Sequence, residues 1–148
     1  MQLTLYTDYS LRVLIYLGLN DDELATISEI ATAYSISRNH LVKVVHNLAH
    51  QGFIQTSRGK GGGMRLARPA SQISLADVVR QTEPGFNLVE CFDDSTSACP
   101  IDSMCILKKV LQKSSRAFMT ELERYTLADI LGNRQELRIP LQIGRASP

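Results

Sequence analysis

Apolar residues recur at the spacing of an α-helix along most of the chain, which predicts a mainly helical protein. Residues 3–19 are apolar on more than one side, so we expect a helix that packs against several neighbours. Thr26 and Glu29 have the spacing of an N-terminal capping box, which predicts a short helix that ends at about Tyr34.

A second, longer helix is predicted directly after Ser37, because residues 38–50 carry one apolar face. That face consists of Leu41, Val44, Val45 and Leu48. A short helix, a tight connection at residues 35–36 and a longer basic helix together predict a helix-turn-helix.

Two short strands are predicted in the segments FIQTSR and MRLAR, on either side of the glycine-rich residues 59–63. A glycine-rich hairpin directly after a helix-turn-helix is typical of the wing of a winged helix. The glycines do not match the G-x4-G-K-[ST] pattern of a Walker loop, so DNA phosphates are the expected partner. Glycine also allows close approach to a narrow groove.

Two further helices are predicted after the wing. Ser74 and Asp77 have capping-box spacing and predict a helix that ends at about Thr82. From about Met104, apolar residues at alternating steps of four and three predict a helix about 30 Å long. Its apolar seam consists of Leu107, Leu111, Ser114, Phe118, Leu122 and Tyr125. Such a helix is expected to mediate dimerisation, and packing only on the chain's own first helix is the alternative. A final capped turn is predicted at Thr126–Asp129.

The distribution of charge points to a polyanionic partner. The net charge is only +1, yet residues 30–76 contain no carboxylate and carry a series of arginines and lysines. We expect base contacts from the start of the second helix, and groove and backbone contacts from the wing. The residues expected to contact double-stranded DNA are Ser37, Arg38, Asn39, His40, Lys43, Arg58, Lys60, Gly61, Gly62 and Arg65.

All three cysteines, Cys91, Cys99 and Cys105, lie in one stretch that has no Lys or Arg between Arg80 and Lys108. Three thiols cannot all pair within one chain, so a framework of disulfides alone is excluded. The stretch also carries the carboxylates of Glu83, Glu90, Asp93, Asp94 and Asp102. Its own charge therefore disfavours thiolates, whereas a bound cation would stabilise them. Soft sulfur ligands favour zinc or an iron–sulfur cluster, and three unrelated cysteines are the alternative.

Five segments match a known family in combination: LTLYTDYSLRVLIYL, SRNHLVKVVHNL, RGKGGGMRLARP, LVECFDDSTSACPIDSMCILKKVL and YTLADIL. Over about residues 1–131 they resemble the Rrf-type winged-helix iron–sulfur regulators, and within them the nitric-oxide-sensing branch. The resemblance implies a homodimeric repressor that releases operator DNA when nitric oxide attacks its cluster, derepressing nitric-oxide detoxification genes. An alternative within the family is a sensor of iron–sulfur or redox status based on a 2Fe-2S cluster, zinc or thiols.

The resemblance also implies a set of cluster ligands. One 4Fe-4S cluster per subunit would be held by Cys91, Cys99 and Cys105, with Asp8 contributed by the other subunit. From its spacing alone, Asp8 is equally suited to an ion pair with Arg12, and the two arrangements could alternate between states with and without the cluster.

The sister branch that binds a 2Fe-2S cluster uses a histidine shortly after its third cysteine. Lys108 stands at that place here, and the chain has no histidine beyond His50. This difference argues against the 2Fe-2S interpretation.

The fold class expected is mainly α with a small two-stranded wing: a winged helix-turn-helix plus a long C-terminal dimerisation helix. The expected divisions are a DNA-binding domain at 1–83, a cysteine loop at 84–105, a dimerisation helix with its cap at 106–132, and a loose tail at 133–148. The sequence shows no nucleophile–base pair of the kind that many enzymes use, so an enzyme is not expected. No signal peptide and no apolar run of membrane-spanning length are present, so a cytoplasmic protein is expected.

Overall fold

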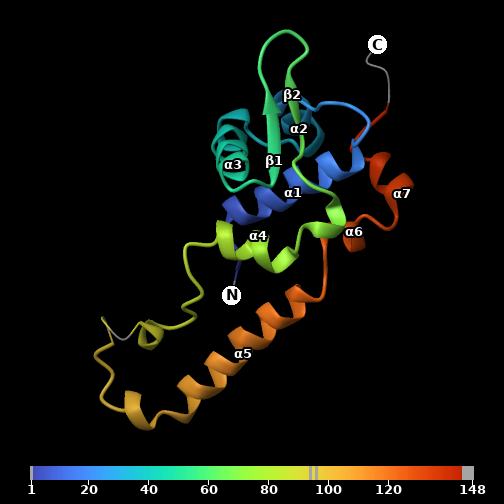
Figure 1. The fold of residues 1–148 in the computed structure, drawn as a ribbon. Coiled ribbons are helices and arrows are strands. Elements are labelled where there is room, and N and C mark those ends of the chain that lie inside the picture. The colour runs from blue at the N-terminus through green and yellow to red at the C-terminus, as the bar shows by residue number, and fades with distance from the viewer. Residues whose placement is uncertain (1, 94, 96, 145–148) are drawn as a thin grey trace.

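Helix α1 (Leu5–Leu19) runs through the middle of the structure, and most other elements pack around it (Figure 1). The structure, a computed structural model, describes residues 2–93, 95 and 97–144. Asp94 and residues 145–148, which the sequence places in the acidic loop and the tail, lie outside the described residues. After α1 the elements are α2 (Ile27–Tyr34), α3 (Arg38–His50), β1 (Ile54–Ser57), β2 (Gly63–Leu66), α4 (Leu75–Thr82), α5 (Ile106–Glu123), α6 (Leu127–Ile130) and α7 (Arg134–Arg138).

Helix α1 is buried on several sides, as its all-round apolar pattern predicts. It contacts α3, α4, β2, α6 and α7, and Val13, Leu14 and Leu19 are fully buried. Its N-terminus is held by Glu83, whose carboxylate accepts hydrogen bonds from the Thr4 backbone N (2.7 Å) and Oγ1 (3.0 Å). Burial disfavours ionisation of Glu83, but hydrogen bonds from Thr7 and Thr4 together leave its pKa below the usual value.

The helix-turn-helix forms as the sequence predicts. The Thr26 backbone N donates to the Glu29 carboxylate (2.6 Å) and the Glu29 backbone N to Thr26 Oγ1 (3.2 Å), which confirms the capping box. Ser35 adopts the left-handed conformation (φ +53°) that turns the chain into α3. Ser37 precedes α3, but its side chain makes no capping hydrogen bond.

Strands β1 and β2 form the predicted antiparallel wing, with Ile54 opposite Leu66 and Ser57 opposite Gly63 (Figure 1). The wing is fixed to the body by Ala25 and Met64, which exchange two backbone hydrogen bonds (3.0 and 2.7 Å). A mainly helical chain with one two-stranded wing confirms the predicted fold class.

The glycines at the wing tip have a local structural reason as well as the predicted one of groove access. Gly59 and Gly61 have positive φ angles (+98° and +78°), where glycine is favoured. A Cβ at Gly62 would lie 2.4 Å from the backbone oxygen of Ser57, so the turn itself excludes a side chain there.

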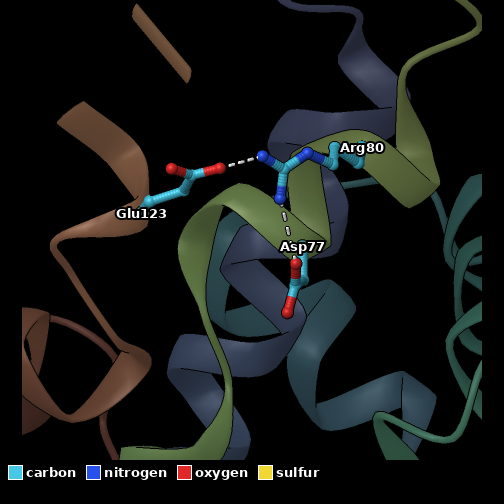
Figure 2. A network of polar contacts seen from close by, with 3 residues as sticks. All are labelled: Asp77, Arg80 and Glu123. Carbon is cyan, nitrogen blue, oxygen red and sulfur yellow. Dashed lines mark hydrogen bonds and ion pairs between the residues drawn. The ribbon is translucent and has the colours of Figure 1, made fainter. Parts of the chain in front are cut away.

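Helix α4 begins after Ser74 as predicted, but the predicted capping box does not form. Asp77 instead pairs with Arg80 (3.2 Å), and Arg80 also pairs with Glu123 at the end of α5 (Figure 2). Arg80 therefore ties α4 to a residue 43 positions away. The Asp77 carboxylate pairs with Arg80, one turn later in the same helix, and not with the Ser74 backbone.

Helix α5 extends away from the body, in the direction opposite to the wing (Figure 1). None of its residues is fully buried. The predicted apolar seam is not one surface: Leu111, Phe118 and Leu122 are half-buried, whereas Leu107 and Tyr125 are exposed. Within the chain, α5 packs mainly against α4 and also contacts the 3-10 turn Glu90–Phe92, so it does not pack only on the first helix.

After α5 the chain returns to the body. Leu75 N donates to Tyr125 O (3.0 Å) and Leu127 N to Ile73 O (2.8 Å), which joins the start of α4 to the start of α6. The Asp129 carboxylate accepts from Thr126 N and Oγ1 (both 2.7 Å), as the predicted capped turn requires.

The expectation of a loose tail is wrong for residues 134–143. Residues Arg134–Arg138 form α7, Leu137 and Leu141 pack against the core, and Ile143 is buried. Arg134 also pairs with Asp21 (2.7 Å). The apolar residues of this segment are too irregularly spaced to reveal a helix, and only the body of the protein gives them a surface to cover.

We expect Gly62→Ala to destabilise the wing, because the new Cβ would overlap backbone atoms that cannot move independently. Overpacking of this kind costs about 1–3 kcal/mol in free energy of unfolding, measurable by urea denaturation. Gly85→Ala is the matched control, since a Cβ there meets no atom within 4 Å. Equal stability of the two variants would contradict the account of Gly62.

Candidate nucleic-acid interface and cysteine loop

The side chains predicted to contact DNA lie on exposed surfaces of α3 and the wing. Ser37, Arg38, Asn39, His40 and Lys43 are exposed at the start of α3, opposite the face that Leu41, Val44, Val45 and Leu48 bury in the core. Arg58, Lys60, Gly61 and Arg65 are exposed on the wing, and Gly62 is half-buried. These surfaces carry basic groups, and residues 30–76 contain no carboxylate that would offset their charge. A phosphate-binding face has this character.

His40 has a second neighbour that sequence patterns do not reveal. Its ring lies against Tyr9 of α1, with ring centroids 6.2 Å apart. The beginning of α3 is therefore in contact with the first turns of α1. His46 and His50 are also exposed on the surface of α3.

Asp8 forms the ion pair with Arg12 that its spacing predicts, at 2.9 Å. Both side chains are about 40% exposed (Asp8 40%, Arg12 41%), so the pair contributes only about 0.3–0.5 kcal/mol. The Arg12 guanidinium also lies 5.7 Å from the ring centre of Tyr34 in α2. Burial raises the pKa of Tyr34 to about 12, so Arg12 faces a neutral ring at physiological pH. Arg12 thus links Asp8 to Tyr34 in the helix-turn-helix.

The cysteine loop projects from the body beside α5 (Figure 1). Cys91 and Cys99 line one open pocket of about 430 Å³, together with Val89, Glu90, Ser97 and Ala98. Cys91 belongs to the 3-10 turn Glu90–Phe92, which contacts α5. All three cysteines are free thiols, and Cys99 is exposed.

Cys105 occupies the N-cap position of α5. Its Sγ accepts a hydrogen bond from the Lys108 backbone N (3.3 Å). This hydrogen bond fixes the sulfur against the first turn of α5, at the positive end of the helix dipole.

The donor set fits a soft metal or an iron–sulfur cluster, but one chain does not assemble it. The loop offers three free thiols, and two of them share a pocket. Among residues 2–93, 95 and 97–144, no three His, Cys, Asp or Glu side chains converge as a metal site requires. Asp8 is engaged with Arg12 and not with the loop of its own chain. A complete site accordingly requires movement of the loop, a donor from elsewhere, or both.

Lys108 has a role in the loop that the sequence analysis missed. Its ammonium lies 2.8 and 2.9 Å from the two carboxylate oxygens of Asp102, and its side chain is only 13% exposed. The pair joins the 3-10 turn Asp102–Met104 to the first turn of α5, with Cys105 between them. The six-residue separation of Asp102 and Lys108 is not a helical spacing, so no periodic signal indicates the contact.

The chain is similar to known regulators along nearly its whole length. Residues 3–133 match the profile of the Rrf2 family, described as iron-dependent transcriptional regulators. The transcriptional regulator NsrR of Bacillus subtilis is 47% identical over 138 residues, 93% of this chain and 94% of the relative. NsrR of Oceanobacillus iheyensis is 51% identical over 138 residues, with 93% of this chain and 94% of the relative covered.

Solved structures agree in fold. T. potens IscR superposes with a TM-score of 0.73 at 21% identity, covering 100% of this chain and 94% of that chain. CymR, the global cysteine regulator of B. subtilis, superposes with a TM-score of 0.72 at 21% identity, covering 90% and 98%. The similarities support a transcriptional regulator and not an enzyme. Within the described residues, no helix is both long and apolar enough to cross a membrane.

We expect Lys108→Met to loosen the loop around Cys105, because it removes the ammonium that holds Asp102. A local loss of about 1 kcal/mol would speed alkylation of the Cys105 thiol roughly fivefold in metal-free protein, measured by mass spectrometry. The control is Lys109→Met, which alters the exposed neighbouring residue. Equal alkylation rates in the wild type and both variants would rule out a bracing role for Lys108.

Proposed function

The chain belongs to the Rrf2 family of iron-dependent transcriptional regulators, and from this premise we propose that it is a homodimeric repressor that senses nitric oxide through a 4Fe-4S cluster. The observation that carries the proposal is the location of all three free cysteines on one anionic loop that leads into the N-terminus of α5, in a chain that also has a basic winged helix. The nitric-oxide input rests on the resemblance of the wing, the loop and YTLADIL to the nitric-oxide-sensing branch.

For DNA binding, α3 would enter the major groove and the wing would lie along the adjacent backbone and minor groove. Arg38, Asn39 and His40 are exposed at the N-terminal end of α3, where recognition helices contact base edges. Lys60 at the wing tip, Arg58 directly after β1 and Arg65 on β2 would neutralise phosphates. Gly61 and Gly62 would bring the tip close to the groove.

A second copy of the chain is the proposed partner of α5. The start of this helix exposes Ile106 (76%), Leu107 (63%) and Val110 (53%), next to Met104 (75%). These side chains form an apolar group at the end of the helix farthest from the body, where this chain provides no cover. Burial of such side chains in a dimer contributes about 1.5–3 kcal/mol each.

Cys91, Cys99 and Cys105 would hold the cluster by sulfur, and the partner subunit's Asp8 would hold it by oxygen. When bound, the cluster would supply the iron with which nitric oxide reacts. A carboxylate oxygen is a harder ligand than a thiolate and leaves iron more readily, so the Asp8 position is the expected point of entry.

The residues around Asp8 suggest how cluster loss reaches the DNA. In this structure Asp8 pairs with Arg12, and Arg12 contacts Tyr34 in α2. Tyr9, the next residue, contacts His40 at the start of α3. Transfer of the Asp8 carboxylate from Arg12 to iron would therefore change contacts on both helices of the helix-turn-helix. We infer that the protein with its cluster bound favours operator binding, and that the Asp8–Arg12 pair forms in the protein that has lost its cluster and released the DNA.

The proposal is tested by metal analysis of Asp8→Ala beside the wild type, both purified without oxygen. For the wild type we expect about four irons and four acid-labile sulfides per chain and a visible spectrum that nitric oxide bleaches. Asp8→Ala should retain iron on its three cysteines but react with nitric oxide at a different rate. Identical spectra and rates would remove Asp8 from the ligand set. Two irons per chain, or zinc alone, would instead favour the alternative sensors within the family.

Wing contact with phosphate predicts a smaller salt dependence for Lys60→Ala. Loss of one phosphate contact should reduce the slope of log K against log salt by about 1. The slope is obtained from DNA-binding titrations at several salt concentrations. Lys113→Ala, an exposed substitution on α5, serves as the control and should leave the slope unchanged. An unchanged slope for Lys60→Ala would show that the tip does not contact the backbone.

A further inference from the structure

Val42 is an exposed apolar residue on the polar face of α3. Its side chain is 44% exposed, whereas its neighbours Leu41 (0%) and Val44 (1%) are buried. It lies one helical turn after Arg38 and one turn before His46, next to Lys43, and these three side chains are exposed. Among the described residues of α3, Val42 is the one large apolar side chain that is exposed in this way.

A valine at position 42 contributes little to the stability of the fold. Since the core of the helix-turn-helix is formed by the opposite face of α3, Val42 adds no fully buried surface. A β-branched residue is also a weaker helix former than the lysine, glutamate or arginine typical of exposed helix positions. A residue that stabilises neither the core nor the helix is better explained by a contact made outside the chain.

Resting on the proposed DNA-binding function, we propose that Val42 contacts the 5-methyl group of a thymine in the major groove and so selects a T·A pair in each half-site. The thymine methyl is the apolar group that the major groove presents, and small apolar side chains are its usual partners. Arg38 and Lys43 would hold α3 in the groove. Val42 would then add the apolar contact that they cannot make.

The test uses duplexes that full-length wild-type protein, purified without oxygen, selects from a randomised library. Each conserved thymine of the selected half-site is replaced singly by deoxyuridine, which removes only the methyl group. We expect one position at which this replacement weakens wild-type binding about fourfold, the effect of one methyl group in an apolar contact. At that position Val42→Ala should bind the thymine and deoxyuridine duplexes equally.

Two further variants make the result specific. Val42→Thr keeps one γ-methyl group and should retain most of the preference for thymine, which excludes a general effect of altering the helix. Lys43→Ala should weaken binding to both duplexes equally and keep the preference. Circular dichroism is expected to be unchanged in Val42→Ala, since the side chain is not in the core.

The failures of this inference and of the proposed function are distinguishable. If wild-type protein selects no sequence over random DNA, the proposed DNA-binding function fails and this inference with it. If sequences are selected but deoxyuridine has no effect at any position, or Val42→Ala keeps the wild-type preference, the role of Val42 is overturned and the proposed function stands.

Discussion

The structure depends on the burial of α1 among elements from both halves of the chain. Helices α3 and α4 and strand β2 pack on it from the DNA-binding half, and α6 and α7 pack on it from the C-terminal half. At Gly18 the packing leaves no room for a side chain, since a Cβ would lie 2.5 Å from a methyl carbon of the buried Leu131. Each fully buried large apolar side chain contributes about 1.5–3 kcal/mol, so α1 alone accounts for a large share of the stabilisation.

If Asp8 is a cluster ligand as proposed, this central position makes α1 the connection between the two candidate sites. The wing and α5 extend in opposite directions, so the wing and the cysteine loop beside α5 lie apart in one chain (Figure 1). The first turns of α1 carry both the Asp8–Arg12 pair and the Tyr9 contact with His40. A carboxylate that changes partner here would act on the recognition helix through a contact already in place. The ion pair is weak and exposed, and such a pair can be exchanged for a metal bond at little cost.

One part of the cysteine loop, around Cys105, is held in place by α5, whereas the described residues of the loop do not come together as a metal site. Cys105 is held at the N-terminus of α5, and Lys108 anchors the preceding turn through Asp102. Lys108 also brings a positive charge into a stretch whose other charged residues, from Glu83 to Asp102, are all acidic. The position that a sister branch uses for a ligand histidine is thus engaged in an ion pair. This arrangement agrees with ligation that does not involve residue 108.

Local interactions explain what the sequence by itself determined. Helices α1 to α6, the wing and the capping boxes at Thr26 and Thr126 follow from contacts within a few residues, so periodicity and short motifs predict them. The charge of residues 30–76 and the position of the three cysteines are likewise properties of the sequence. The tertiary structure decided whatever depends on distant partners. Glu123 holds Arg80 from 43 positions away, and the body gives Ile143 a surface on which the tail folds. The same reason separates the seam of α5 into a half-buried part and an exposed part, since periodicity shows that a face is apolar but not what covers it.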